Sequence, residues 1–184
     1  MRRYFITYGD ELFKDAKKRI VKEAEQLGLF DNIIAYDNNG VSPLLKKSEI
    51  FSIKRGGGLW SWKPDVILQT LYIMDDNDIL VYCDAGCKLQ LCKEWQWYLN
   101  TLNKYHIIAQ RIYQRTENWT RRELIDYFKE NGSLWPKMFQ FQAGIIILKK
   151  TAFTVQFVKE WRDLMINNSQ LAMDVDSHDM IYQI

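Results

Sequence analysis

An aspartate at the end of an apolar segment is the residue of this 184-residue chain best placed to do chemistry. The segment Ile79–Cys83 is rich in strand-forming residues, and Asp84, Ala85 and Gly86 follow it directly. In an open α/β sheet, ligands gather where strands end at their carboxyl side. A carboxylate in that place can hold a divalent cation together with bound phosphates. The alternative is that Asp84 and Gly86 form only a turn after a buried strand.

A second segment of interest is the run of three glycines and two tryptophans between Arg55 and Pro64. Pro64 suits the first position of a helix, and the apolar residues up to Met74 predict about three helical turns. The free N–H groups that open this helix favour an anion, and glycine permits close backbone approach. Arg55 and Lys63 add cations that suit a diphosphate. The alternative is a structural turn with two core tryptophans.

Composition and the spacing of motifs argue against several classes of protein. No G-x-G-x-x-G follows a predicted strand and no G-x-x-x-x-G-K-[ST] occurs, which argues against a dinucleotide oxidoreductase and a P-loop NTPase. A net charge of +2, from 25 basic and 23 acidic residues, gives no field that would imply nucleic acid. Cys83, Cys87 and Cys92 lack the paired spacing of a zinc site. No apolar run reaches the length of a membrane span, so we expect a cytoplasmic protein.

Strand and helix patterns alternate along the chain, without an internal repeat or a linker that divides it. Strands separated by helices predict a mostly parallel sheet. Capping signals open helices at Asp10 and at Thr120, and glycines close them at Gly28 and Gly132. The predicted strands are residues 4–8, 32–36, 79–83, 106–109 and 144–148, and the predicted helices are residues 10–27, 64–74, about 95–102, 120–131 and 152–168. One helical stripe is predicted from Leu12, Ala16, Ile20, Ala24 and Leu27.

The two segments together resemble a known family, the bacterial capsule and surface polysaccharide glycosyltransferases of the GT-A type. This family is distantly similar to fungal galactosyl- and mannosyltransferases that carry a D-x-D signature. The resemblance rests on residues 56–64, which end in W-K-P, and on residues 78–86, which end in D-A-G. It continues through residues 117–120, 142–148, 157–161 and 178–179, and so covers nearly the whole chain. The D-x-D signature appears here as D-A-G, which lacks the second carboxylate and weakens the implied metal site.

The resemblance implies a single-domain α/β fold of the GT-A, Rossmann-like type over residues 1–184, with a mostly parallel central sheet flanked by helices. It implies transfer of a sugar from a UDP- or GDP-sugar to a hydroxyl of a glycan or lipid-linked acceptor, with possible peripheral contact to a membrane. Asp84 and His178 would hold Mn²⁺ or Mg²⁺. Asp179 and Gln142 would face the reacting sugar or the acceptor. The predicted donor residues are Thr7, Tyr8, Asp37, Arg55, Gly57, Trp60, Lys63, Asp84, Ala85 and Gly86.

Two other functions fit parts of the pattern. A non-catalytic relative that binds sugar nucleotides or glycans would explain the missing second carboxylate. It would also explain the end of the chain at Ile184, where relatives usually continue into another helix of the acceptor region. A sugar-phosphate nucleotidyltransferase fits less well, because residues 7–10 read Thr-Tyr-Gly-Asp rather than a long glycine-rich loop.

Overall fold

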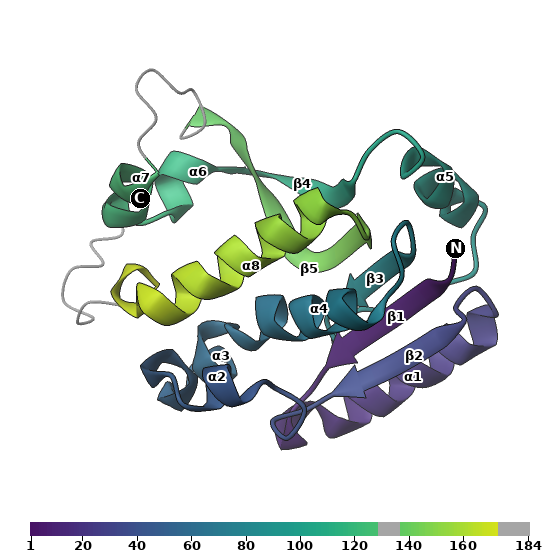
Figure 1. Ribbon diagram of the computed structural model, residues 1–184, viewed down its shortest axis with the longest axis horizontal. Coiled ribbons are helices and arrows are strands. Elements are labelled where there is room, and N and C mark those ends of the chain that lie inside the picture. Colours follow the sequence, from purple (N-terminus) through teal and green to yellow (C-terminus); the bar gives the residue numbers. More distant parts are fainter. Residues whose placement is uncertain (129–136, 173–184) are drawn as a thin grey trace.

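Five strands form one mixed sheet in the computed structural model, which describes residues 1–128 and 137–172 (Figure 1). The strands are β1 (Arg3–Tyr8), β2 (Asn32–Tyr36), β3 (Ile79–Cys83), β4 (Ile107–Arg115) and β5 (Phe139–Lys149), in the order β2-β1-β3-β5-β4. The strand β1 pairs in parallel with β2 and β3, whereas β5 runs antiparallel to β3 and β4. Four of the five strands therefore point the same way, which confirms a mostly parallel sheet.

Helices cover both faces of this sheet. They are α1 (Lys14–Leu27), α2 (Pro43–Lys46), α3 (Gly56–Leu59), α4 (Trp62–Ile73), α5 (Glu94–Thr101), α6 (Thr116–Trp119), α7 (Arg122–Tyr127) and α8 (Ala152–Asn167), with the 3₁₀ turns η1 (Glu11–Phe13), η2 (Glu49–Ser52) and η4 (Ser169–Leu171). In Figure 1, α4 and α8 lie in front of the sheet and α1 lies behind it. The two faces thus bury two separate apolar cores.

The alternation of side chains along a strand explains the two cores. Tyr4 and Ile6 of β1 point into the core that contains most of α4 and part of α8. Phe5, between them, points into the core beneath α1 and α5. Most of α4 is buried because it lies between the sheet and α8, which accounts for its apolar sequence.

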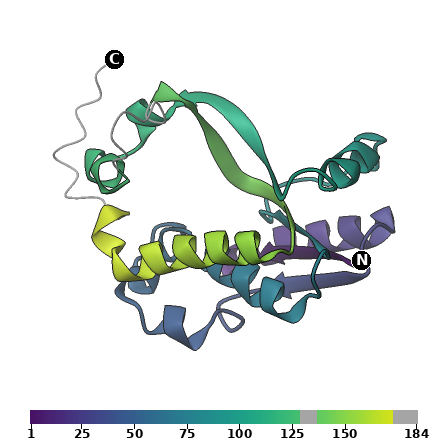
Figure 2. The ribbon, with the colours of Figure 1, turned by 45° about the horizontal axis from the view of Figure 1, so that its top comes forward.

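Three sequence predictions need correction. The strands predicted at residues 106–109 and 144–148 are longer, and their outer halves rise away from the other strands as a twisted ribbon in Figure 2. The apolar residues of β5 predicted a strand but contained nothing that fixed its antiparallel direction. The capping box at Thr120 does not form, because α7 begins after Arg121 and no side chain caps it. The predicted end of that helix at Gly132 lies outside the described residues.

The start of α1 also differs from the prediction. Asp10 is the predicted cap, and its Oδ1 accepts hydrogen bonds from Leu12 N at 3.0 Å and Phe13 N at 3.3 Å. The first turn is 3₁₀, however, and the α-helix begins only at Lys14. Leu12 is 91% exposed and does not join the apolar stripe. The helix ends as predicted at Gly28, which has a left-handed φ of 61°.

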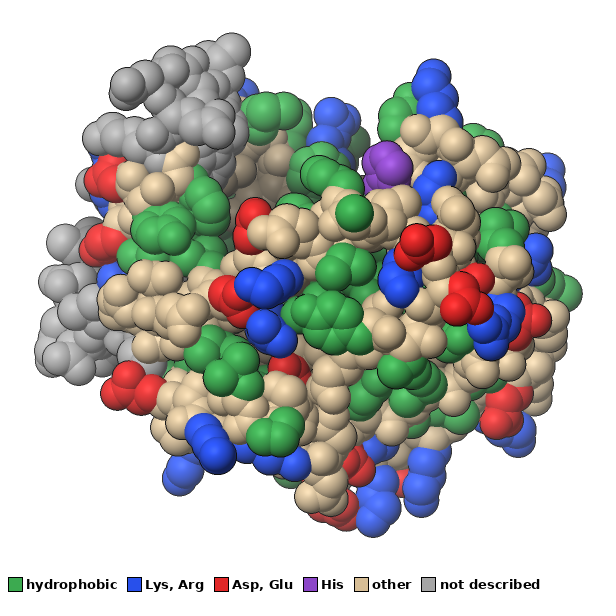
Figure 3. All heavy atoms as spheres, in the orientation of Figure 1, with side chains coloured by type: hydrophobic (Ala, Val, Ile, Leu, Met, Phe, Trp, Pro, Cys, Tyr) green, Lys and Arg blue, Asp and Glu red, His purple; other side chains and the backbone are tan. Residues whose placement is uncertain are grey.

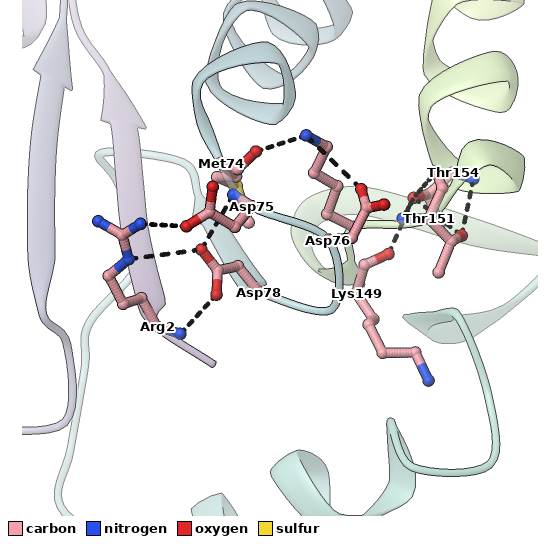
Figure 4. A network of polar contacts seen from close by, with 9 residues as sticks. Arg2, Met74, Asp75, Asp76, Asp78, Lys149, Thr151 and Thr154 are labelled. Carbon is pink, nitrogen blue, oxygen red and sulfur yellow. Dashed lines mark hydrogen bonds and ion pairs between the residues drawn. The ribbon is translucent and has the colours of Figure 1, made fainter.

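A polar network fixes the amino end of β3 (Figure 4). Asp78 accepts hydrogen bonds from the backbone N–H of Arg2 at 2.6 Å and of Asp75 at 3.1 Å. The side chain of Arg2 pairs with Asp75 and lies 3.8 Å from Asp78. On the other side of the same loop, Lys150 pairs with Asp76 and donates to the carbonyl of Met74. These contacts tie β1, the loop after α4 and the end of β5 together.

Candidate functional site

A cavity of about 300 Å³ opens where β1 and β3 end at their carboxyl sides. The two segments that the sequence singled out meet there: the D-A-G residues after β3 and the glycine and tryptophan turn before α4. Residues that follow β1 complete the wall. The lining residues are Tyr8, Gly9, Asp10, Leu12, Phe13, Lys54, Gly56, Gly57, Trp60, Trp62, Asp84, Ala85 and Gly86.

Asp84 reaches this cavity with its carboxylate held in place from behind. Its side chain is 37% exposed. The hydroxyl of Tyr82 donates to Oδ1, and Nζ of Lys63 lies 3.0 Å from Oδ1 and 3.3 Å from Oδ2. The backbone N–H of Asp84 donates to the carbonyl of Gly144 at 2.8 Å. Asp84 is therefore part of a specific side-chain network as well as of a turn.

Lys63 faces Asp84 instead of the open cavity. Its side chain is only 7% exposed, and Nζ also donates to the carbonyl of Ala143 at 2.9 Å. The ammonium lies 5.6 Å from the ring centroid of Trp62 and 5.3 Å from that of Tyr82, within the range of cation–π attraction. Lys63 thus pairs with Asp84 and does not line the cavity, and its predicted role in donor binding stays a prediction.

Burial keeps the two tyrosines of the site neutral. Burial, followed by the nearby charge of Asp84, raises the pKa of Tyr82 well above its usual value. Burial and the charges of Asp10 and Asp37 raise the pKa of Tyr8 to about 12. Both phenols therefore donate hydrogen bonds at neutral pH, Tyr82 to Asp84 and Tyr8 to Asn38.

The glycine turn has an uncommon backbone. Five consecutive residues have left-handed φ values: the three glycines, at 58°, 58° and 93°, then Leu59 at 50° and Trp60 at 59°. Hydrogen bonds from Leu59 N to Arg55 O at 2.8 Å and from Trp60 N to Gly56 O at 3.1 Å close this left-handed turn. Such a turn costs about 1–2 kcal/mol for each residue other than glycine. Backbone strain of this kind gathers at ligand sites.

Two of the glycines are required by space as well as by φ. A Cβ on Gly56 would lie 2.7 Å from the ring of Trp60, and one on Gly58 would lie 2.9 Å from the Cα of Phe51. A Cβ on Gly57 would meet nothing closer than 3.6 Å. Gly57 lines the cavity, so its missing side chain leaves room for a ligand to approach the backbone.

The two tryptophans of the turn have different roles. Trp62 is 7% exposed, stacks on Tyr8 with ring centroids 3.9 Å apart, and donates its indole N–H to the carbonyl of Gly56 at 3.0 Å. It anchors the turn to the end of β1. Trp60 is 47% exposed at the edge of the cavity. Phe13 and Leu12, 55% and 91% exposed, lie at the same cavity and offer further apolar surface.

Sequence reasoning missed Asp10, Lys54 and Arg19 as site residues. Asp10 and Lys54 line the cavity. Arg19 of α1 donates to the carbonyls of Ala85 at 2.9 Å and Cys87 at 2.8 Å, which holds the loop after Asp84. The position of Asp10 after β1 was a usable signal, whereas the contacts of Arg19 span more than 60 residues of sequence.

Other predicted donor residues lie away from the cavity lining. Thr7 is fully buried, and its hydroxyl has no hydrogen-bond partner within the described structure. Asp37 accepts from the N–H groups of Asn39 and Gly40 and so closes the turn after β2. Arg55 is exposed beside Lys54 but does not line the cavity. Their roles in donor binding stay predictions.

Of the predicted catalytic residues, the structure describes only Gln142, which does not line this cavity. Gln142 lies on β5, donates to Gln110 of β4, and lines a second cavity of about 750 Å³. His178 and Asp179 lie outside the described residues. The proposed roles of these three residues are therefore untested.

The donor set at Asp84 fits a cation that arrives with its own phosphate ligands. Among residues 1–128 and 137–172, no cluster of three or more His, Cys, Asp or Glu side chains could hold a metal ion. Mg²⁺ is commonly held by one or two carboxylates while substrate phosphates and water complete its shell. Asp84 offers one exposed carboxylate of this kind, already part-neutralised by Lys63.

Comparison with solved structures gives one match that supports the fold and two weaker ones. The galactosyltransferase LgtC, solved with donor and acceptor sugar analogues, superimposes with a TM-score of 0.52 at 10% identity, over 94% of this chain and 66% of LgtC. Mouse xyloside xylosyltransferase 1 matches over 88% of this chain and 75% of its own length at 12% identity, with a TM-score of 0.47. A 4-diphosphocytidyl-2C-methyl-D-erythritol synthase from Anaerococcus prevotii matches over 97% and 80% at 9% identity, also with a TM-score of 0.47.

The likeness to LgtC shows a fold of the GT-A, Rossmann-like type. The chain spans 66% of the length of LgtC. No protein-family model matches the sequence, and no curated protein does. In the part of the chain that the structure describes, none of the helices has the length and apolar character to cross a membrane.

Proposed function

We propose that this protein is a glycosyltransferase that moves a sugar from a UDP- or GDP-sugar to an acceptor hydroxyl in the synthesis of a surface polysaccharide or other glycan. One observation supports this most directly. The exposed carboxylate of Asp84 and the left-handed glycine turn share one cavity at the carboxyl edge of a GT-A sheet. Ligands of open α/β sheets bind at this edge.

In this reaction the bond between the anomeric carbon and the diphosphate breaks, and a bond to the acceptor oxygen forms as that hydroxyl loses its proton. Negative charge grows on the leaving diphosphate, so electrostatic stabilisation there contributes most. A divalent ion, when bound, supplies part of this charge compensation. Asp84 would hold Mn²⁺ or Mg²⁺, with His178 as a second ligand.

Residues at the cavity would bind the rest of the donor. Lys54 of the cavity lining would supply a cation, as would the exposed Arg55 that follows it in the chain, and Gly57 would let phosphate oxygens approach the backbone. The exposed rings of Phe13 and Trp60 offer stacking surfaces for a base or a sugar. Gln142 and Asp179 would act on the sugar or acceptor side.

A second candidate is a protein that binds a sugar nucleotide without transferring the sugar. The observation that favours it is the single carboxylate in the D-A-G segment, which Lys63 neutralises in part. Both candidates require nucleotide binding at the same cavity, so binding alone does not separate them.

Calorimetric titration with UDP and GDP, each with and without Mn²⁺, tests the shared requirement. We expect one nucleotide to bind with a dissociation constant in the micromolar range, on the order of −8 kcal/mol. The Asp84→Asn variant should lose the Mn²⁺-dependent part of that affinity. Absence of binding by both nucleotides would contradict the proposed function.

Release of free nucleotide from a panel of UDP- and GDP-sugars then separates the two candidates. Turnover with any donor supports the transferase. Nucleotide binding without hydrolysis or transfer, across the panel and with added glycan acceptors, supports the non-catalytic protein instead.

A further inference from the structure

The second cavity is larger than the first and mostly apolar. It measures about 750 Å³ and lies between the β4–β5 ribbon, α7 and α8. Apolar side chains from all four elements form its wall, among them Ile107, Leu124, Ile146, Trp161 and Leu164. In Figure 3 the surface is hollowed above α8, with hydrophobic side chains along the edge. The volume lies within the range of small-molecule binding sites.

Exposed rings surround this cavity. Among its lining residues, Tyr127 is 54% exposed, Phe141 62% and Phe157 45%. They come from α7, β5 and α8, so three successive elements present aromatic side chains to one opening. Apolar surface that gathers in this way marks a binding site more often than scattered exposed residues do.

The charges of the lining exclude an anionic ligand inside the cavity. No Lys or Arg belongs to the described lining, and the charged members are Glu160 and Asp163. Asp163 is paired with Lys159 and Arg162, each at 2.8 Å. The first cavity, by contrast, is lined by Lys54 beside its two carboxylates. The first cavity therefore offers a phosphate one cation, Lys54, whereas the described lining of the second offers none and suits an uncharged apolar group.

The strand β5 lies between the second cavity and Asp84 of the first. Ala143 lines the second cavity, while its carbonyl accepts the hydrogen bond from Lys63 that stands behind Asp84. The next residue, Gly144, accepts from the backbone N–H of Asp84, and a Cβ there would lie 3.3 Å from Asp84 Oδ2. Two successive residues of one strand thus separate the apolar cavity from the carboxylate.

We propose that the second cavity binds the hydrocarbon chain of a lipid-linked acceptor. This inference rests on the proposed function, because it places the sugar donor in the first cavity and the acceptor in the second. The chain lies among the rings of Phe157, Trp161 and Phe141, and the sugar attached to it lies near Gln142 and Ala143. The lipid class is an uncharged alkyl or prenyl chain, since the lining residues that the structure describes offer no cation to a charged group.

Dodecyl maltoside, used below the concentration at which it forms micelles, is a suitable probe because maltose is its matched control without the chain. Binding is measured by titration calorimetry on the full chain. We expect micromolar binding of dodecyl maltoside and at least roughly 100-fold weaker binding of maltose, since burial of each CH₂ contributes about 0.8 kcal/mol. Equal affinities for the two compounds would overturn the proposal.

Two phenylalanines of α8 provide a matched pair of variants. Phe157 lines the cavity, whereas Phe153 is 58% exposed on the same helix and does not. Phe157→Ser should weaken dodecyl maltoside binding by roughly tenfold, and Phe153→Ser should change it by less than about twofold. Equal losses in the two variants would show detergent adsorption and contradict the proposal.

A variant that fills part of the cavity tests the proposal without removing a side chain. Ala109 lines the cavity from β4 and is partly buried, so Ala109→Leu narrows it and should also weaken dodecyl maltoside binding. UDP and GDP titrations on the same samples keep the two proposals distinguishable. Nucleotide binding with no preference for the alkyl chain would overturn only this inference, whereas alkyl binding without nucleotide binding would overturn the proposed function.

Discussion

Two aspartates bracket β3, and the structure gives them opposite surroundings. Asp78 precedes the strand and Asp84 follows it. The side chain of Asp78 is 3% exposed and enclosed by the N–H groups of Arg2 and Asp75, whereas that of Asp84 is 37% exposed at a cavity. The same residue type is thus structural at the amino end of the sheet and available to a ligand at the carboxyl end.

The comparison shows what distinguishes a site from a structural network. Each carboxylate has a cationic neighbour, Arg2 for Asp78 and Lys63 for Asp84. At the amino end both carboxylate oxygens accept from backbone N–H groups, those of Arg2 and Asp75, and the side chain is almost fully buried. At the carboxyl end the donors approach from behind, and one side of the carboxylate stays open. Removal of the Asp84 carboxylate should therefore lower turnover, whereas removal of the Asp78 carboxylate should lower stability.

The largest expected effect is on turnover in Asp84→Asn. The asparagine keeps an acceptor for Lys63 but loses the charge that would hold a cation near the diphosphate. We expect kcat/KM to fall by roughly 10²–10³-fold, about 3–4 kcal/mol of transition-state stabilisation. The matched control is Asp76→Asn, whose carboxylate is 83% exposed at the other end of the sheet. Equal turnover in the two variants would remove Asp84 from the mechanism.

Asp84→Ala is a less clean variant, because it leaves the buried ammonium of Lys63 without a hydrogen-bond acceptor on residue 84 as well as without its counter-charge. Loss of one partner of a buried pair costs about 3–5 kcal/mol of stability. A fall in activity in that variant would then mix unfolding with chemistry, so we base the comparison on asparagine.

Asp78→Ala should show the reverse pattern, with loss of stability and unchanged nucleotide affinity. It leaves the N–H groups of Arg2 and Asp75 without their charged acceptor at the start of β3. Hydrogen bonds to charged groups contribute about 1.5–3 kcal/mol each, so we expect the free energy of unfolding to fall by about 3 kcal/mol. Urea unfolding measures this change. A variant as stable as the parent would show that the network in Figure 4 adds little.

The sequence singled out both segments of the candidate site but not the direction of each side chain. Strands of a parallel sheet share one carboxyl edge, so placing Asp84 beside a turn that precedes a helix needed only the order of elements. The orientation of Lys63 was not predictable, because α4 begins at Trp62, two residues before the predicted start, and Lys63 bonds to a carbonyl 80 residues later. No local pattern encodes such a contact.

The same reasoning explains the errors in the fold. The apolar run at residues 144–148 reads the same in either direction, so it predicted a strand but not the antiparallel pairing with β3. The exposure of Leu12 follows from a 3₁₀ first turn, which shifts the side chain out of the expected helical stripe. Only the glycines of the left-handed turn could be predicted to adopt positive φ values. Leu59 and Trp60 are of residue types that usually avoid such backbone angles.

A smaller effect is expected from glycine variants that test this turn. A Cβ on Gly58 would meet the backbone of Phe51 at 2.9 Å, whereas one on Gly57 would meet nothing closer than 3.6 Å, an ordinary contact. We expect Gly58→Ala to lower the free energy of unfolding by about 2 kcal/mol and Gly57→Ala by about 1 kcal/mol, the latter through backbone strain alone. Gly57→Ala should nevertheless weaken nucleotide binding, because its methyl group enters the cavity. Equal stability losses would contradict the close contact at Gly58.

The smallest expected effect concerns the phenol behind Asp84. Tyr82→Phe removes one donor from the carboxylate and should reduce kcat/KM by roughly fivefold, about 1 kcal/mol, because a typical hydrogen bond contributes that much. Tyr36→Phe is the matched control, since its hydroxyl also bonds to a side chain, Thr70 at 3.0 Å, but away from the cavity lining. Both variants should lose similar stability, and only Tyr82→Phe should lose activity. An equal fall in kcat/KM for both would mean that the Tyr82 hydroxyl acts through general stability and does not position the carboxylate.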